Sequence, residues 1–210
     1  MLIPYSKVLE ILRHHGIQVR GILHVGAHEC EELRDYVAGG VSADSVVWVE
    51  GNADKVALMK AHGVPNVHYG LVSDKEEEVV FNITNNGQSS SILALETHKV
   101  EHPHVYVSEV RKERTTTLKK LAEEHAIDMR RLNFWNFDIQ GAELMALRGA
   151  GDLLESAEAL YLEVNEKELY KGCALLGEMD AFLAERGFRR VDMVMLQHGW
   201  GDAVYVRVKA

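Results

Sequence analysis

Residues 21–29 of the chain read Gly-Ile-Leu-His-Val-Gly-Ala-His-Glu, and residues 46–50 read Val-Val-Trp-Val-Glu. The first stretch is typical of an apolar strand that runs into a turn containing Gly26, and the acidic residues after it indicate the start of a helix. The second stretch predicts another strand, about one helix later, that ends in the carboxylate of Glu50. This order of elements favours a parallel sheet with right-handed crossovers.

The turn and the end of the second strand also suit an adenosine-containing ligand. Gly26 has no side chain to keep a ligand from the backbone, and Glu50 can accept hydrogen bonds from ribose hydroxyls. The dinucleotide fingerprint with three glycines is absent, and Glu29, Glu31 and Glu32 would repel a pyrophosphate. The segment therefore favours an adenosine without phosphates, and S-adenosylmethionine fits best. An ordinary strand, turn and helix without a ligand is the alternative that it leaves open.

Composition bounds the class of protein. The chain has 210 residues, of which 47% are hydrophobic and 26% charged, as expected for one globular domain spanning residues 1–210. Its formal net charge of -9 argues against a nucleic-acid partner, which would need a basic face. We interpret the arginine clusters at residues 111–114 and 130–131 as solvated surface.

Cysteine usage and hydropathy bear on the compartment. Cys30 and Cys173 lie far apart in sequence and resemble neither a disulfide framework nor a cysteine metal site. No apolar run approaches the length of a membrane span, and residues 1–15 lack the apolar core and cleavage site of a signal peptide. We therefore expect no membrane span and a reducing, cytoplasmic location.

The rest of the chain alternates helices and strands around an irregular middle. Further strands are expected at residues 67–71, 78–84, 106–117, 132–139 and 159–164, with an antiparallel closing pair at 188–195 and 203–208 around a turn at 198–202. Helices are expected within residues 1–16, up to residue 37, and at 53–62, 117–125, 141–148 and 175–186. Residues 85–106 are polar and poor in core residues, so we interpret them as a lid or substrate insertion.

Polar residues stand at the predicted carboxyl ends of the strands, where ligands bind in open α/β sheets. These residues are His28, Glu50, Asp74, Asp138 and Glu163. Each has an ordinary alternative: Glu50 as the neighbour of a helix cap, Asp74 as a turn residue, and Glu163 as a solvated strand end. Their joint position at one edge nevertheless predicts a site.

Two blocks carry a resemblance to a known family. Residues 137–143, Phe-Asp-Ile-Gln-Gly-Ala-Glu, and residues 147–150, Leu-Arg-Gly-Ala, resemble the signature of the FkbM family of S-adenosylmethionine-dependent methyltransferases. Residues 24–28 resemble its cofactor turn, 71–74 its third-strand exit, 89–91 its serine-rich loop and 117–118 its Thr-Leu pair. The chain departs from the family at His24, Cys30 and Gln140, where Asp, Gly and Glu are usual. An amide at position 140 cannot titrate.

The resemblance implies both a fold and a set of site residues. The fold is α/β, Rossmann-like and of the class I methyltransferase type, with a mostly parallel seven-stranded sheet, helices on both faces and an antiparallel last strand. The implied cofactor-binding residues are Gly26, Ala27 and His28 at the methionine end, Glu50 at the ribose, Ser73 and Asp74 at the adenine, and Asp138 near the transferred methyl group. The substrate is assigned to Ser90, Gln140 and Glu163.

The expected chemistry asks little of the protein beyond alignment, because the methyl group of the cofactor is already activated. A hydroxyl acceptor also needs a general base or a metal. The candidate catalytic residues are Asp138 and His198, with the cluster of His98, His102 and His104 as further candidates and surface histidines as the alternative. Asp138, Glu163 and Asn165 resemble the Mg²⁺ ligands of catechol-type O-methyltransferases, but the FkbM resemblance favours no metal, and none is assigned.

These observations predict O-methylation of a hydroxyl on a sugar, a glycan or another small metabolite. The alternatives are an N-methyltransferase acting on a small amine, a nucleic-acid or protein methyltransferase, a nicotinamide-dependent oxidoreductase, and a non-catalytic cofactor-binding module. The net acidity argues against the second alternative, and the single glycine of the turn argues against the third. The sequence leaves the acceptor and the oligomeric state open.

Overall fold

A computed structural model describes residues 1–208 of the chain and contains a seven-stranded sheet with the strand order β3-β2-β1-β7-β8-β10-β9. Its strands are β1 (Ile22–Val25), β2 (Val46–Glu50), β3 (Val67–Tyr69), β7 (Phe134–Phe137), β8 (Ala159–Asn165), β9 (Phe188–Met195) and β10 (Trp200–Arg207). Neighbouring strands from β3 to β8 pair in parallel, whereas β10 runs antiparallel to both β8 and β9. The predicted fold class is confirmed: a mostly parallel, Rossmann-like sheet whose last strand is reversed.

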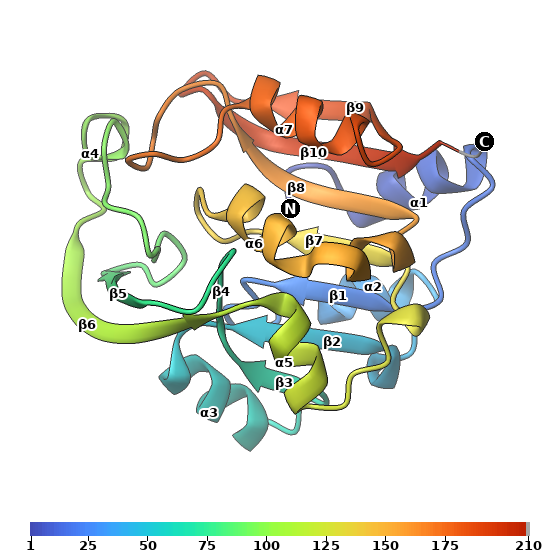
Figure 1. The fold of residues 1–210 in the computed structure, drawn as a ribbon, viewed down its shortest axis with the longest axis horizontal. Coiled ribbons are helices and arrows are strands. Elements are labelled where there is room, and N and C mark those ends of the chain that lie inside the picture. Colours follow the sequence, from blue (N-terminus) through green and yellow to red (C-terminus); the bar gives the residue numbers. More distant parts are fainter. Residues whose placement is uncertain (209–210) are drawn as a thin grey trace.

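Helices cover both faces of this sheet, as the sequence predicted (Figure 1). One face is covered by α1 (Tyr5–His14), α2 (Leu33–Ala38) and α3 (Ala53–Ala61), and the other by α5 (Leu118–Glu124), α6 (Glu143–Ala150) and α7 (Leu176–Ala184). Short 3-10 helices lie at Ala43–Ser45, Met129–Arg131 and Gly151–Ser156. Within residues 1–208, no helix is long and apolar enough to cross a membrane.

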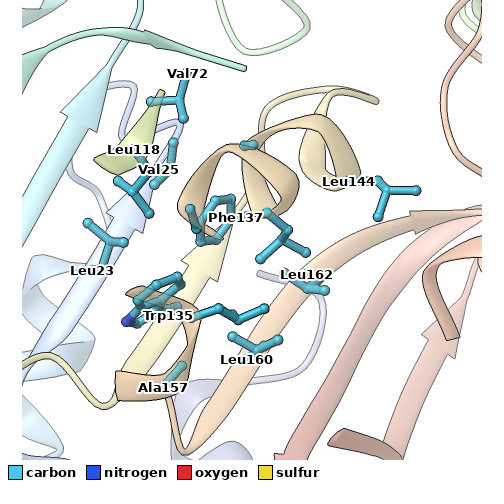
Figure 2. Packing of buried hydrophobic residues seen from close by; sticks show 14 of the residues in the cluster. Leu23, Val25, Val72, Leu118, Trp135, Phe137, Leu144, Ala157, Leu160 and Leu162 are labelled. Atoms are coloured by element: carbon cyan, nitrogen blue, oxygen red, sulfur yellow. The ribbon is translucent and has the colours of Figure 1, made fainter. Parts of the chain in front are cut away.

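The central strands are buried on both sides because alternate residues enter two different cores. In β7, Trp135 and Phe137 pack on the α5–α7 side with Leu160 and Leu162 of β8, as Figure 2 shows, while Phe134 packs on the α1–α3 side. All four β7 residues are buried, which explains why this strand is a continuous apolar and aromatic run. Each large side chain buried here contributes roughly 1.5–3 kcal/mol. The strand ends that carry the site are therefore held rigidly.

A second, three-stranded sheet follows β3 and was not foreseen as a sheet. Its order is β4-β6-β5, with β4 (Leu71–Val72), β5 (Glu78–Thr84) and β6 (Val107–Thr116). A short helix, α4 (His98–Glu101), lies in the segment between β5 and β6. In Figure 1 this sheet and α4 lie at the end of the main sheet to which β2 and β3 point. The insertion therefore stands over the carboxyl edge, where a ligand would bind.

Among the predicted boundaries that differ from the structure, three bear on the site or on the second sheet. The helix after the first turn begins only at Leu33, because His28 and Cys30 have positive φ angles of 44° and 55° that do not belong to a helix. The third strand ends at Tyr69, and after Gly70 the chain pairs with β6 instead. The last strand begins at Trp200 rather than residue 203, so the closing turn is shorter than predicted. In contrast, Thr117 caps α5 as expected and accepts a hydrogen bond from the Lys120 N–H at 3.1 Å.

Candidate active site

Two cavities meet at the carboxyl edge of the main sheet. One, here called the narrow slot, has a volume of about 60 Å³ and lies between the ends of β1 and β2, the second sheet and the start of α6. The other, here called the wide cavity, has a volume of about 430 Å³ and extends over β7, β8 and β10 to α4. Both are lined by Gly26, His28, Gln88 and Asp138. The two cavities therefore adjoin at these four residues.

Gly26 forms the closest backbone approach of the site. Its φ of +87° is unfavourable for any residue with a side chain, and a Cβ at this position would stand 1.8 Å from the Asp138 carbonyl oxygen. The Gly26 N–H donates to the Val49 carbonyl at 2.9 Å, and the Asp138 N–H donates to the Val25 carbonyl at 3.0 Å. The ends of β1, β2 and β7 are thus tied together at one point. Ala27, the next residue, lines the wide cavity.

Glu50 ends β2 and lines the narrow slot. Its carboxylate accepts hydrogen bonds from the His28 N–H at 2.7 Å and from the Asn52 N–H at 2.6 Å. Burial raises the pKa of this carboxyl above its usual value, and the two backbone hydrogen bonds oppose that shift. The two N–H groups hold the carboxylate in one orientation and leave it further lone pairs. A vicinal diol such as ribose is a suitable donor to them.

We predict that Glu50→Ala weakens S-adenosylmethionine binding by on the order of 1–3 kcal/mol, the scale for losing a hydrogen bond to a charged group. Isothermal titration calorimetry measures the affinity, and urea melts establish that the variant is folded. Glu78→Ala, which changes an exposed residue of β5, is the matched control and should bind normally. Unchanged affinity in a folded Glu50→Ala protein would exclude the ribose contact.

The remainder of the narrow slot is mainly apolar. Leu71, Val72, Phe81, Ile92, Ile139 and Ala142 line it. At about 10–15 Å³ for each water, its volume corresponds to roughly five water molecules. Gly51 and Gly70 also line it and add no side chains. The apolar lining therefore suits the adenine of an adenosine ligand whose ribose lies at Glu50.

The residues assigned to the adenine lie behind this slot rather than along it. Ser73 is buried, and its carbonyl oxygen packs against α6, since a Cβ on Gly149 would stand 2.0 Å from it. Asp74 is exposed and accepts a long, 3.4 Å hydrogen bond from the Ser73 hydroxyl. Neither residue lines either cavity, so their adenine contact stays a prediction that this geometry does not favour. Ser90, assigned to the substrate, lines the narrow slot instead.

Asp138, Gln140 and Glu163, all assigned from the sequence, come together in the wide cavity. The Gln140 amide donates to Asp138 at 2.6 Å and to Glu163 at 2.5 Å, and its oxygen accepts from the Tyr170 hydroxyl. The orientation of the amide follows from these partners, because only its nitrogen can donate to two carboxylates. Gln140 adopts a positive φ of 57°, a strained conformation for a residue with a side chain. The strain and the three hydrogen bonds fix the amide between the two carboxylates.

Asp138 does not cap α6, although a capping role was the ordinary alternative for it. The cap position of this helix is Ala142, and no side chain caps it there. Instead the buried Glu143 carboxyl accepts from the Ile139 N–H at 2.8 Å and the Gly141 N–H at 3.2 Å. Burial raises the pKa of Glu143 to about 7. Glu143 thus holds the turn, and the Asp138 side chain is left open to the cavities.

The histidines divide into two groups. His98, His102 and His104 line the wide cavity, whereas His198 does not. His198 instead pairs with Glu101 of α4 at 2.6 Å, linking this helix to the turn between β9 and β10. Its catalytic role stays a prediction, and its contacts favour a part in holding α4. Burial lowers the pKa of His98 to about 4, so this imidazole is neutral near pH 7.

No group of three His, Cys, Asp or Glu side chains within residues 1–208 is arranged to hold a metal ion. Asp138 and Glu163 are bridged by the Gln140 amide group, which occupies the position that an ion shared by the two would need. Asn165 is buried and does not line the wide cavity. Asp138 and Glu163, two of the three residues that the sequence suggested for Mg²⁺, are therefore already engaged in hydrogen bonds with a neutral amide.

Some lining residues were missed by sequence reasoning. Phe81 and Ile92 reach the slot from the second sheet and its loop, whose fold could not be foreseen from local pattern alone. Asp202 lines the wide cavity from β10, although the sequence placed it in a turn between Gly201 and Ala203. A lone acid beside a strongly apolar strand was the available signal. No sequence pattern pointed to Tyr170, whose hydroxyl donates to the Gln140 amide oxygen.

Strand order, a reversed last strand, a glycine turn after β1 and a carboxylate at the end of β2 together give the Rossmann-like fold of the class I methyltransferase type. Within that class, residues 24–190 match the family model described as the Methyltransferase FkbM domain. The chain belongs to the FkbM methyltransferase family, as its signature residues predicted. It is a methyltransferase.

Solved structures with a similar arrangement are distant in sequence. A candidate tRNA (m1A22) methyltransferase from Streptococcus pneumoniae is 14% identical, with 97% of this chain and 72% of that chain covered and a TM-score of 0.49. Magnesium protoporphyrin IX methyltransferase from Synechocystis, solved with S-adenosylmethionine, is 13% identical over 97% and 77%, with a TM-score of 0.48. A methyltransferase from Aquifex aeolicus is 12% identical over 97% and 89%, with a TM-score of 0.45. No match was found among curated proteins.

Proposed function

We propose that this methyltransferase transfers the methyl group of S-adenosylmethionine to a hydroxyl of a sugar, a glycan or another small metabolite bound in the wide cavity. The observation that carries the proposal is the position of Asp138, which lines both the narrow slot and the wide cavity. An adenosine in the slot and an acceptor in the cavity meet only along such shared residues. A carboxylate at that point faces the place where methyl transfer occurs.

The side chains of the chain have separate tasks in this proposal. The slot holds the adenine, Glu50 holds the ribose, and the turn at Gly26, Ala27 and His28 borders the methionine end. When bound, S-adenosylmethionine supplies an activated methyl group, so the protein aligns the reactants rather than activating the donor. Asp138 accepts the proton of the acceptor hydroxyl, since a hydroxyl is a poor nucleophile until its proton is removed.

Two measurements test the proposal. Calorimetry should detect S-adenosylmethionine binding to the purified protein, and mass spectrometry should detect any copurified cofactor. Incubation with methyl-labelled S-adenosylmethionine and a metabolite mixture should then place label on an oxygen of a small product. Binding without transfer would support a non-catalytic module instead, and a labelled nitrogen would support N-methylation. A copurified nicotinamide cofactor would overturn the proposal altogether.

We propose further that residues 85–106 form a lid over the acceptor. Asn86, Gln88 and Ser89 of this segment line the wide cavity together with the three histidines of the α4 region. Hydrogen bonds hold this segment to the body at two places. The N–H groups of Glu96, Thr97 and His98 donate to carbonyls of residues 168–169 at 2.8–3.3 Å, and Ser91 exchanges backbone hydrogen bonds with Asn82 at 2.9 and 3.0 Å. The polar stretches outside these two places are the parts that we expect to open.

Hydrogen exchange of the ligand-free protein tests the lid. We expect amides of residues 85–104 to exchange much faster than those of Phe134–Phe137, because the latter sit in a buried parallel strand. Adding S-adenosylhomocysteine together with an acceptor should slow exchange in the segment and leave β7 unchanged. Protection of the segment as strong as that of β7 without any ligand would count against a lid.

The remaining assignments stay predictions. A single domain over residues 1–210, a cytoplasmic location and the lack of a nucleic-acid partner follow from composition alone. Limited proteolysis and gel-shift assays address the first and the last of these. None of them affects the chemistry proposed for the wide cavity.

A further inference from the structure

Three carboxylates stand side by side in the wide cavity, contributed by β8, β10 and the end of β7. Glu163 of β8 and Asp202 of β10 are direct partners in the antiparallel register, so their side chains leave the same face of the sheet. Asp138 follows β7 and is joined to Glu163 by the Gln140 amide. Like charges placed directly opposite each other on neighbouring strands destabilise a sheet. This row therefore needs a compensating positive charge or protons.

Apart from the hydrogen bond that Glu163 and Asp138 share with each other, the hydrogen-bond partners of the row are neutral. Gln140 donates to Asp138 and Glu163, and Asp202 accepts from the Tyr161 hydroxyl and from the Leu2 N–H at 2.5 Å. Glu163 and Asp202 are each only 5% exposed, so water screens them weakly. Burial raises the pKa of both carboxyls, and in Glu163 the charge of Asp138 raises it further. The charged form of such buried carboxyls is strongly stabilised when a cation approaches.

The cavity itself offers no lysine or arginine. Of the residues 1–208, those that line it include five acids, namely Glu31, Glu32, Asp138, Glu163 and Asp202, and no lysine or arginine. Glu31 lies 2.7 Å from the His28 imidazole, and Glu32 lies 3.7 Å from the amino group of Met1, whose charge also acts on Asp202. S-adenosylmethionine carries one net positive charge, and its methionine end lies nearest to Asp138 in the proposed function. Glu163 and Asp202 are then left for the acceptor.

A second observation marks the same cavity as a binding site. His98 lines it and is only 5% exposed, yet its Nδ1 has no hydrogen-bond partner among the described residues. A buried polar atom without a partner costs free energy unless a ligand or water meets it. Tyr170 and Trp200 also line the cavity, and aromatic lining residues suit a cationic ligand.

We propose that the acceptor carries an ammonium group close to the hydroxyl that is methylated, as in an amino sugar or an amino alcohol. The ammonium lies between Glu163 and Asp202, His98 contacts a polar group of the acceptor, and the hydroxyl faces Asp138. The inference rests on the proposed function and narrows its substrate class. Phosphorylated and carboxylated acceptors are excluded, because the row of carboxylates would repel them.

The reaction balances without any further reagent. The acceptor oxygen forms a bond to the methyl carbon while the carbon–sulfur bond of S-adenosylmethionine breaks, and that electron pair remains on sulfur. The hydroxyl proton passes to Asp138 and then to solvent. The ammonium keeps its three protons, so it is bound but not methylated.

A matched pair of acceptor pools tests the proposal with methyl-labelled S-adenosylmethionine. One pool contains amino sugars and amino alcohols with free amines, and the other contains the same compounds after N-acetylation, which leaves their hydroxyls intact. We expect at least tenfold more label from the amine pool, attached to oxygen. Equal label from both pools, no label from the amine pool, or label on nitrogen would overturn the proposal. Equal transfer to the acetylated pool would support the proposed O-methylation, but it would exclude a requirement for an ammonium group on the acceptor.

Substitutions of Glu163 and Asp202 provide a second test. Glu163→Gln should lower kcat/KM for the labelled amine at least tenfold, and Asp202→Asn should act in the same direction, because each removes one charge facing the ammonium. The affinity for S-adenosylmethionine should stay unchanged, which also shows that the variants are folded. Glu166→Gln, an exposed residue just beyond β8, is the control and should behave as wild type. Wild-type kcat/KM in folded Glu163→Gln would contradict the inference.

Discussion

Gly26→Ala is expected to abolish measurable S-adenosylmethionine binding and to destabilise the protein by roughly 3–5 kcal/mol, the sum of a strained backbone and an overpacked contact. The added Cβ would stand 1.8 Å from the Asp138 carbonyl oxygen, and the residue would keep a φ of +87°. Because both partners are backbone, neither can rotate away, and the ends of β1 and β7 must separate. That movement displaces Asp138 and the floor on which the two cavities meet. Urea melts and calorimetry measure the two effects.

Gly63→Ala is the matched control for this substitution. Gly63 also has a positive φ, +77°, but an added Cβ would meet nothing within 4 Å. It therefore carries the backbone strain without the collision, and we expect a loss of about 1–2 kcal/mol with normal cofactor binding. If Gly26→Ala costs no more than Gly63→Ala and still binds S-adenosylmethionine, the close approach of β1 and β7 is not what the site requires.

Much of the fold was predictable because buried parallel strands leave a strong local signal. The run at Val46–Glu50 predicted β2 with the observed bounds, and its terminal carboxylate pointed to the ligand edge. The same holds for Asp138 after the aromatic run of β7, and for Gly26 after β1. In each case one residue at the end of a strand is enough to predict a position in the site, since the carboxyl ends of parallel strands share an edge.

What the sequence could not show is pairing between distant segments. The contact between β4 and β6 depends on where Gly70 ends β3, and this contact moves Leu71 and Val72 into the narrow slot. The start of β10 at Trp200 is set by pairing with Asn165 of β8, and this pairing brings Asp202 opposite Glu163. A local pattern holds no information on either partner. The pairing of His198 with Glu101 was hidden for the same reason.

Asp138→Asn should lower turnover roughly a hundredfold or more, the scale of losing a general base or a central electrostatic contact. The substitution keeps the shape of the side chain and its oxygen for the Gln140 amide, which donates to it at 2.6 Å. It removes the charge that faces both cavities and the group that accepts the hydroxyl proton. Because Asp138 caps no helix, the melting temperature should stay the same or rise slightly as repulsion with Glu163 falls.

The control for this change is Asp152→Asn, which alters an exposed carboxylate that pairs with Lys119 at 2.8 Å far from the cavities. It should leave turnover unchanged and change the stability little, because a surface ion pair is weak and screened by solvent. Steady-state kinetics with saturating S-adenosylmethionine separates a loss of turnover from a loss of cofactor affinity. A folded Asp138→Asn enzyme that methylates at the wild-type rate would remove Asp138 from the reaction. A variant that melts early and remains active would assign the residue to the structure of the turn instead.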